Sequence, residues 1–541
     1  MDRFAPSSSR STSSQTDGGE GKSTPHFCTA LLPWVIGIKL GHPLHVLFSL
    51  LSIMLLAACG GGDSQDTDKK FIFSPVDTSF NATEVRYPGN YKLQVLYTEG
   101  DPEKVEWKGI MAPGKGKQDF IVYLPIDSSS THGVLWVNHE TVSAHPGIGD
   151  GGGASVMEVF RDPADGWKVI GFPYAIDFAN VGGTLHNCLG ALTPWGTILS
   201  SEGIEPTSNF TPDPDHLAKK PIPDSTDYNG IPRWKNYGWM VEVNPMTRKV
   251  LGKHHAMGRF KHGGAAVTPD EKTVYMCDEE DPCAFFKFVA DTARKLSSGR
   301  LFAWRMKADT NGSHWIPLPR GRDSLMYARR YAFQRGASMF LRLEDIELLP
   351  DGTFLVSESG QDSANLAAAV ALGGKVMPHL AKFHLGHEIY DDRNGRILRY
   401  DPRSETMEVV LEGGQAIEDR SIVLSNPGNL AYDHRRKLLV IFEDLNGTSS
   451  NRVPKRENAR KVCEIYFLPL TGAIPRLDDL RRFAVLPPNC KGSGAYWTPD
   501  FGSLFFNIQN GTEKGEESVP PNDRSKTVVV TGFPEFHSLE P

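Results

Sequence analysis

Residues 265–276 read AAVTPDEKTVYM, and this stretch sets a pattern that returns along the chain. Two alanines and Val267 lead into a Thr-Pro-Asp turn, and a second apolar run, Val274-Tyr275-Met276, follows it. Pro-Asp pairs favour the dihedral angles of a tight turn between two extended apolar runs. The stretch therefore predicts a β-hairpin.

The same hairpin pattern occurs three more times, at residues 345–356, 429–441 and 495–506. The turn positions 269, 350, 433 and 499 are 81, 83 and 66 residues apart. A second hairpin type begins at residues 238–245 and 395–402. This spacing suits four-stranded blades with long insertions, so we expect an all-β fold, a six-bladed β-propeller with insertions. Repetition of whole hairpin pairs disfavours the alternative, a large β-sandwich.

Composition narrows the class of protein further. The 541 residues carry a formal net charge of −7, which gives no basic footprint for nucleic acid. The 53 glycines and 38 prolines fit a turn-rich β architecture. Five cysteines follow Cys59, and an odd number in an exported chain implies at least one free or metal-bound thiol. Cys277 and Cys283 either pair in an oxidising compartment or are two buried free thiols.

The N-terminal region resembles an export signal. Leu44 to Ala58 form an apolar segment, LHVLFSLLSIMLLAA, of signal-peptide length, and Cys59 follows directly. We expect a lipoprotein whose Cys59 thiol accepts the lipid and anchors the chain at the outer membrane or the periplasmic face. The alternative is an uncleaved membrane anchor lengthened by the apolar run 30–38. The expected division is a signal peptide with a long leader (1–58), a flexible tether (59–80), a propeller (81–515) and a loosely packed C-terminal tail (516–541).

Polar residues near the inner strand of each repeat are the candidate site, because those strands converge on a propeller axis. Residues 182–202, GGTLHNCLGALTPWGTILSSE, place Asn187 and Cys188 at such a position. Arg342 and Glu344 stand at another. Thiolates favour iron, copper or zinc, and carboxylates favour calcium or magnesium. Thiol, carboxylate and arginine together suit metal-assisted phosphoryl chemistry, although each residue alone has a plainer structural explanation.

Several segments resemble the PhoX-type alkaline phosphatase family, in the family's order, from about residue 85 to about residue 515. They are 136–140 (WVNHE), 182–202, 238–245, 258–262 (GRFKH), 342–347 (RLEDIE), 426–431 (NPGNLA) and 506–509 (FNIQ). The resemblance implies a six-bladed propeller with an added subdomain. It also implies hydrolysis of phosphate esters at a central cluster of iron and calcium.

The resemblance also assigns roles to individual residues. Cys188 is expected to bind iron, and Glu202 and Glu344 are expected to bind metal. Arg342 is expected to face the phosphate as the catalytic residue, with Asn187 beside it in substrate binding.

The chain departs from the family pattern at two expected ligands. Gly263 stands where the family has Glu, and Gly428 stands where it has Asp. Asn510 also replaces a histidine, and the twin-arginine export signal is missing. Losing two carboxylates weakens a site for multivalent cations unless other carboxylates take their place. The carboxylates available for this are Asp278, Glu279, Glu280, Asp391 and Asp392, which the sequence does not position.

Three functions compete at this point. The first is an exported, metal-dependent phosphatase acting on small phosphate esters, monomeric, attached to the membrane through Cys59 and without a nucleic-acid partner. The second is a non-catalytic propeller lipoprotein with a degenerate site and a binding or structural role, as Gly263 and Gly428 suggest. The third is a calcium-dependent propeller enzyme of lactonase or phytase type, which gives Cys188 no role.

Overall fold

Strands form nearly all of the regular structure in the computed structural model. It describes residues 73–534, except residues 78, 80, 82, 103, 146 and 150 and the segments 213–218, 223–225, 307–313, 415–423, 445–461, 471–474 and 511–523. All of these residues belong to one unit, Ser64–Pro541. The expected all-β class is confirmed. Residues 44–58 and Cys59 lie outside the described residues, so the signal peptide and lipidation stay predictions.

Six sheets of the described part contain four strands or more. In sheet order their strands are β3 (Ile110–Ala112), β2 (Val105–Trp107), β7 (Gly166–Ala175), β6 (Ala154–Asp162), β5 (His132–His139), β4 (Gln118–Pro125); β13 (Lys249–Lys253), β12 (Met240–Asn244), β9 (Ile198–Glu202), β8 (Asn187–Leu192); β14 (His262–Val267), β15 (Thr273–Asp278), β16 (Phe286–Thr292), β17 (Lys295–Trp304), β18 (Trp315–Pro317); β20 (Leu343–Leu348), β21 (Phe354–Glu358), β26 (Arg396–Asp401), β27 (Thr406–Glu412); β28 (Pro427–Asp433), β29 (Leu438–Glu443), β30 (Glu464–Pro469), β31 (Arg481–Val485); and β1 (Lys92–Thr98), β34 (Lys526–Thr531), β33 (Ser503–Asn510), β32 (Cys490–Trp497).

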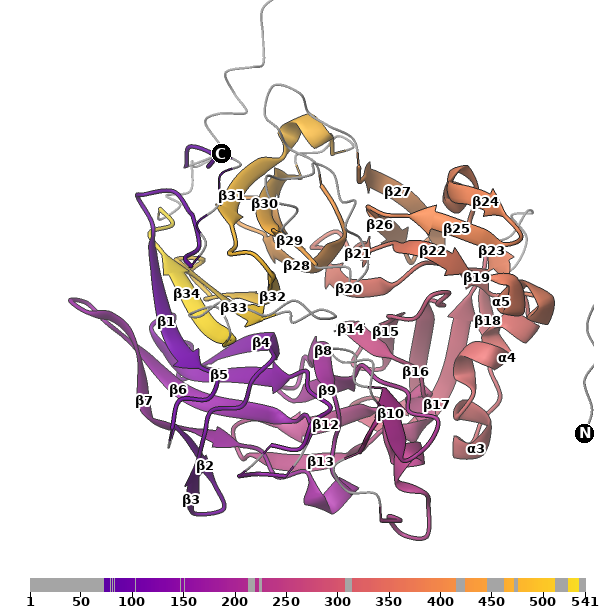
Figure 1. The fold of residues 1–541 in the computed structure, drawn as a ribbon, viewed down its shortest axis with the longest axis horizontal. Coiled ribbons are helices and arrows are strands. Elements are labelled where there is room, and N and C mark those ends of the chain that lie inside the picture. Colours follow the sequence, from indigo (N-terminus) through magenta and orange to yellow (C-terminus); the bar gives the residue numbers. More distant parts are fainter. Residues whose placement is uncertain are drawn as a thin grey trace, which may run out of the picture. The chain divides into compact units, whose positions relative to one another are not determined.

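One strand of each sheet lies toward a common centre (Figure 1). These inner strands are β4, β8, β14, β20, β28 and β32, and each contacts the next, with β32 contacting β4 again. Their neighbouring strands are antiparallel hairpin partners, as the recurring turn pattern predicts. Residues that are far apart in the sequence therefore meet at the centre.

Shorter elements are inserted between or within the sheets. They are β10 (Phe210–Pro212) with β11 (Lys219–Pro221), β19 (Ser338–Met339) with β23 (Lys375–Val376), β22 (Gln361–Asn365) with β25 (Ile389–Asp392) and β24 (His384–Gly386), and the helices α3 (Arg322–Leu325), α4 (Ala328–Gln334) and α5 (Ala367–Leu372). Short 3₁₀ turns cover Ala179–Val181, Arg233–Asn236, His255–Met257, Pro378–Phe383 and Leu477–Asp479. None of the helices among the described residues has both the length and the hydropathy needed to span a membrane.

The C-terminal segment corrects the expected domain limits. Residues 526–531 form β34, which pairs with β1 on one side and β33 on the other. Val528, Val529 and Val530 are fully buried there. The interpretation of 516–541 as a loosely packed tail is therefore wrong for this segment. Three consecutive β-branched residues favour a strand, but the partner that buries them lies more than 400 residues away, so the sequence alone did not reveal it.

The expected flexible tether is also shorter than 59–80. Phe73 is 7% exposed and packs edge-on against Phe467 and Phe483. The backbone N–H of Val76 donates a hydrogen bond to the carbonyl of Arg482. Of the two alternatives for Cys277 and Cys283, the structure shows separate buried thiols.

Candidate functional site

Five of the six inner strands carry a β-bulge at the same place. In each hairpin the ladder skips two residues of the inner strand against one residue of its partner. The first bulged residues are Asp119, Cys188, Gly263, Glu344 and Gly428. Bulges re-aim side chains and often lie next to active sites. These five equivalent positions therefore form one set of candidate ligand positions, filled by two carboxylates, one thiol and two glycines.

A second set of equivalent positions follows the partner strands. The residues directly after β5, β9, β15, β21 and β29 are Glu140, Gly203, Glu279, Ser359 and Asp444. In the four sheets whose inner strands are β8, β14, β20 and β28, one of the two positions carries a ligand-type side chain and the other does not. The sheet that contains β4 carries both, Asp119 and Glu140. Each of these sheets thus supplies a ligand-type side chain to the site from one of two equivalent positions, either the bulge or the residue after the partner strand.

The two glycines that depart from the family pattern are explained by this alternation. A Cβ atom on Gly263 would lie 2.8 Å from Glu279 Oε1 and 2.5 Å from the carbonyl oxygen of Glu344. A Cβ atom on Gly428 would lie 3.2 Å from the Cβ atom of Asp444. Glu279 and Asp444 therefore occupy the space that side chains at 263 and 428 would need. Each of the two glycines thus has a carboxylate side chain beside it, supplied by the residue that follows the adjacent strand.

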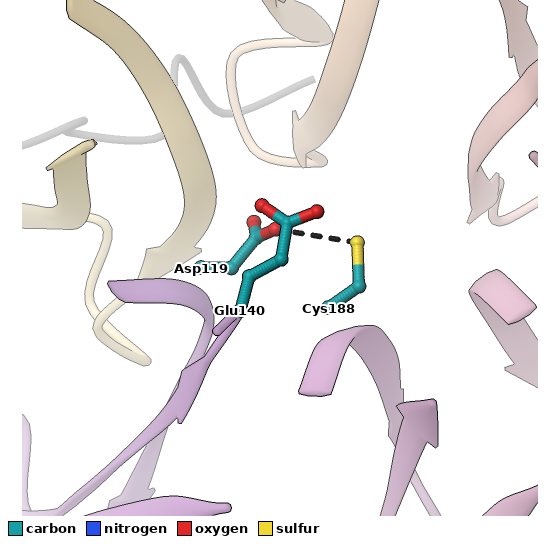
Figure 2. A group of neighbouring side chains, drawn as sticks. All are labelled: Asp119, Glu140 and Cys188. Atoms are coloured by element: carbon teal, nitrogen blue, oxygen red, sulfur yellow. Dashed lines mark hydrogen bonds between the residues drawn. The ribbon is translucent and has the colours of Figure 1, made fainter. Parts of the chain in front are cut away.

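The thiol of Cys188 lies close to side chains from both sets of positions. Its Sγ atom lies 3.3 Å from Asp119 Oδ2 and 3.2 Å from Glu279 Oε1, and its single S–H can donate to either oxygen. One ligand atom each from Asp119, Glu140 and Cys188 lie within 4.8 Å of one another. Figure 2 shows these three side chains directed toward the same point, with the bond between Asp119 and Cys188 dashed. Asp119 Oδ1 is buried and has no hydrogen-bond partner among the residues that the structure describes.

We use the term central cluster for six residues: Asp119, Glu140, Cys188, Glu279, Glu344 and Asp444. Arg342 and Lys491 contact it as permanent cations, and His186 Nε2 lies 3.8 Å from Glu140 Oε1. Arg342 Nη2 lies 2.6 Å from Glu344 Oε1 and 3.2 Å from Asp444 Oδ2. Lys491 Nζ, from β32, lies 3.3 Å from Asp444 Oδ1 and 3.6 Å from Glu140 Oε2. All six inner sheets therefore contribute at least one side chain to the site.

The titration behaviour reflects burial of like charges. Burial raises the pKa of Asp119 well above its ordinary value, and the nearby carboxylate of Glu140 adds to the effect. Burial and then the charge of Glu344 raise the pKa of Glu279. Burial and then Asp119 raise the pKa of the Cys188 thiol. Three neighbouring groups thus favour their protonated forms, which is the behaviour expected where carboxylates and a thiol are gathered without enough positive charge.

Glu140 behaves in the opposite way. Burial alone would raise its pKa, but the positive charges of Lys491 and His186 outweigh burial and hold the pKa well below its ordinary value. For Lys491, burial alone would lower the pKa, but Asp444 and Glu140 hold it well above its ordinary value. Lys491 and Glu140 are therefore both charged in the folded protein.

Of the residues predicted from the sequence, Cys188, Arg342 and Glu344 come together in the site. Glu202 does not. Its carboxylate accepts hydrogen bonds from Thr184, from backbone N–H groups and from Lys253 Nζ at 2.8 Å. Its role as a metal ligand stays a prediction, and these contacts favour a structural role.

The position of Glu202 in its hairpin supports that structural role. The equivalent strand-end residues are Glu358 and Glu443, which accept N–H bonds from Leu341 and Ser425 just as Glu202 accepts one from Leu185. The repeated bond ties each strand end to the loop that precedes its inner strand.

Asn187 is fully buried and its side chain is engaged within the fold. Its Oδ1 atom accepts bonds from the backbone N–H of Gly153 and from the hydroxyl of Thr184, and its Nδ2 atom donates to Ser200 Oγ. The predicted contact of Asn187 with substrate stays a prediction. The contacts show that Asn187 holds the loop around Cys188.

Sequence reasoning missed four residues of the site: Asp119, Glu140, Asp444 and Lys491. Glu140 closes the segment 136–140 that carries part of the family resemblance, so its place after an apolar strand was an available signal. Asp119 precedes the apolar run 120–124, the same position that Glu344 occupies ahead of Ile346. Lys491 has no counterpart in the hairpin pattern, and only the structure identifies it.

The donor set of this site fits a metal. A buried thiol with hard carboxylate oxygens is a combination for a transition metal, and the carboxylates alone suit calcium. The unpartnered Asp119 Oδ1 and the mutual repulsion among the carboxylates both favour a cation at this place. Asp119, Glu140 and Cys188 would hold such an ion together.

These features define a class of protein: an all-β protein with a buried, acidic site that contains a thiol, formed where six sheets meet. The model of the family described as alkaline phosphatase PhoX matches residues 153–512, and the chain belongs to that family.

Among solved structures, the fold is shared with PhoX of Pseudomonas fluorescens. PhoX of Pseudomonas fluorescens, solved in complex with vanadate, a transition state analogue, is 21% identical, with a TM-score of 0.61 over 85% of this chain and 97% of that chain. Hydrazine synthase of Kuenenia stuttgartiensis is 12% identical, with a TM-score of 0.35 over 74% of this chain and 78% of that chain. No curated protein matches at a significant level.

Proposed function

We propose that the protein is a metal-dependent phosphatase that hydrolyses phosphate monoesters at the centre of a six-bladed β-propeller. The observation that carries the proposal is the convergence of Cys188, Asp119 and Glu140 beside Arg342, in a chain of the PhoX family. The ring of six inner strands, each in contact with the next, supports the propeller assignment. The vanadate complex of the P. fluorescens protein supports a phosphoryl-transfer reaction.

Iron and calcium are the cofactors that the donor set favours. The thiol of Cys188 with Asp119 and Glu140 suits iron, and the oxygens of Glu279, Glu344 and Asp444 suit calcium. A multivalent cation, when bound, polarises a phosphoryl oxygen and so stabilises the charge that develops in the transition state.

Arg342 is the residue that we assign to phosphate. Its guanidinium group offers a planar fork of N–H donors that matches two phosphate oxygens. Glu344 and Asp444 hold it at the edge of the central cluster, and they keep its pKa above the ordinary value although burial alone would lower it. Arg342 therefore stays positively charged at any working pH and can orient the ester for attack.

The reaction is hydrolysis of one phosphorus–oxygen bond. The oxygen of a water molecule forms a new bond to phosphorus, and the bond from phosphorus to the ester oxygen breaks. One proton of the water reaches the departing alkoxide, so the products are an alcohol and inorganic phosphate.

The non-catalytic alternative loses its main support. It rested on Gly263 and Gly428, two positions without the expected carboxylates. Glu279 and Asp444 supply carboxylates at the same two places. The site therefore has carboxylates beside both glycines, and their absence at positions 263 and 428 does not leave it without acidic side chains there.

The test combines metal analysis with activity. We expect the full chain, purified without chelators, to contain iron and calcium and to release phosphate from p-nitrophenyl phosphate. The Cys188→Ala variant should lose both iron and activity. A matched control, Cys463→Ala, removes a buried thiol in a different core region and should keep both. Full activity in Cys188→Ala, or a wild-type protein without metal or activity, would overturn the proposal.

We also propose that the protein is exported and attached to a membrane through lipidated Cys59, and that it works as a monomer. The apolar segment 44–58 followed by cysteine supports export and lipidation. Incorporation of labelled palmitate that Cys59→Ser abolishes is the expected result, together with release of the variant from the membrane fraction. Unchanged labelling in the variant would overturn it.

A further inference from the structure

Lys491 brings a positive charge into the central cluster. Its ammonium group lies between Glu140 and Asp444, 3.6 Å and 3.3 Å from their oxygens. These two carboxylates directly follow β5 and β29, which belong to different sheets. A single monovalent cation therefore bridges two acidic side chains in the way that a metal ion bridges its ligands.

The charge balance shows why a cation is needed there. Asp119, Glu140, Glu279, Glu344 and Asp444 are five carboxylates. Among the described residues, Arg342 and Lys491 contact them as permanent cations, and His186 Nε2 lies 3.8 Å from Glu140 Oε1. With a neutral imidazole, full ionisation of the carboxylates would leave three negative charges in excess (five minus two). Without Lys491 the excess would be four. The lysine thus supplies part of the neutralisation that a second metal ion would otherwise supply.

The ammonium group also excludes a multivalent ion from its own surroundings. The repulsion between a unit charge and a divalent ion about 4 Å away is twice that between two unit charges, and a partly buried site screens it weakly. Lys491 and Asp444 are 19% and 7% exposed at their side chains. A cation bound between Glu140 and Asp444 would have to displace the lysine. The ion pairs of the lysine engage Glu140 and Asp444, whereas Cys188 and Asp119 supply the other two ligand atoms of the group that they form with Glu140.

We propose that Lys491 is a built-in cation that takes the place of one calcium ion, so that this protein binds fewer metal ions than its central carboxylates would otherwise hold. The inference rests on the proposed metal site and deepens it. Metal is thereby excluded from the space between Glu140 and Asp444, and Lys491 serves as a positioning residue that fixes these two carboxylates without metal.

Removing the lysine charge tests this directly. In Lys491→Gln we expect calcium to bind at least about tenfold more tightly than in the wild type, because a repelling charge has gone. In Lys491→Glu we expect one more calcium per chain than in the wild type. In both variants, calcium should raise the melting temperature more than in the wild type. Lys491→Arg, which keeps the charge, should bind calcium as the wild type does.

The measurement is calcium titration calorimetry on the full chain, with metal content by mass spectrometry and thermal unfolding with and without calcium. Lys249→Glu is the matched control, because it makes the same charge change at an exposed position of β13. Equal calcium stoichiometry and affinity in the wild type, Lys491→Gln and Lys491→Glu would overturn the inference.

The same data separate this inference from the proposed function. Iron in the wild type with no gain of calcium in either variant refutes the role of Lys491 and leaves the phosphatase proposal standing. A gain of calcium in the variants of a protein that never binds iron supports Lys491 and refutes the iron site at Cys188.

Discussion

Replacing Asp119 by asparagine is expected to stabilise the metal-free protein and to weaken metal binding. Asp119 is 2% exposed, and burial together with Glu140 raises its pKa. One of its oxygens has no hydrogen-bond partner among the described residues. A side chain in this state opposes folding unless a cation is bound, so a neutral side chain of the same shape relieves the cost.

The geometry sets the size of the effect. The ligand atoms of Asp119 and Glu140 lie within 4.8 Å of each other. Two unit charges at that distance repel by about 3 kcal/mol at an effective dielectric constant of 20. Part of this is already avoided, because the raised pKa lets Asp119 keep a proton. We therefore expect a gain of about 1 to 3 kcal/mol, which is a rise of a few degrees in melting temperature for a unit of several hundred residues.

The sign of the pH dependence follows from the raised pKa. A carboxyl whose folded pKa exceeds its unfolded value binds more protons when folded, so its contribution to stability falls as pH rises between the two values. Asparagine has no such dependence. The advantage of Asp119→Asn over the wild type should therefore be small in acid and grow toward neutral and alkaline pH.

The assay is thermal unfolding in EDTA from pH 5 to pH 9, with metal content measured on protein purified without chelators. Asp433→Asn is the control, because Asp433 is a fully buried aspartate that accepts bonds from Arg436 and should destabilise the fold when neutralised. The reasoning fails if Asp119→Asn lowers the melting temperature in EDTA as Asp433→Asn does, or if it retains wild-type iron.

Three further predictions concern the positions around the site. Glu202→Gln should lower the free energy of unfolding by about 3 kcal/mol or more, because it leaves a buried lysine without its charged partner. Thermal unfolding should show this loss of stability while the iron content stays unchanged. Loss of iron at an unchanged melting temperature would instead identify Glu202 as a metal ligand. Gly263→Ala should cost about 1 to 3 kcal/mol through overpacking and should displace Glu279, so calorimetry should show weaker calcium binding; unaltered stability and affinity would contradict the close approach at this glycine. Burial alone would raise the pKa of Glu358, but Arg396 and then His379 hold this pKa at about 2. Glu358→Gln should therefore lose about 3 kcal/mol of stability above pH 4.5, and this loss should shrink as the pH falls toward 2. A stability difference from the wild type that is the same at pH 7 and pH 3 would contradict this.

Much of the architecture follows from local sequence patterns. The turn at Pro269-Asp270 and its repeats identify hairpins, since turn dihedrals and alternating apolar residues act over a few neighbours. The Ala-rich helix at Ala367–Leu372 is equally local. Strand β34 was missed because its burial depends on β1, at the other end of the described chain.

The residues of the candidate site likewise divide into those that local sequence patterns predicted and those that they did not. Cys188, Arg342 and Glu344 were found because they stand in recognisable segments of the family. The sequence did not reveal that the position equivalent to the site carboxylates is Gly203 and that Glu202 lies one residue before it. Successive residues of a strand point to opposite faces, so a difference of one position decides whether a carboxylate reaches the centre.

The sequence by itself determined the all-β class, the repeated hairpins, the family and the thiol that marks the site. Only the tertiary structure decided which carboxylates join that thiol. Glu279 and Asp444 fill the spaces beside Gly263 and Gly428, and Lys491 enters between two sheets. The physical reason is that hairpins form from neighbours along the chain. The site depends on bulge geometry and on contacts between strands that are hundreds of residues apart, and no single segment of the sequence predicts either of them.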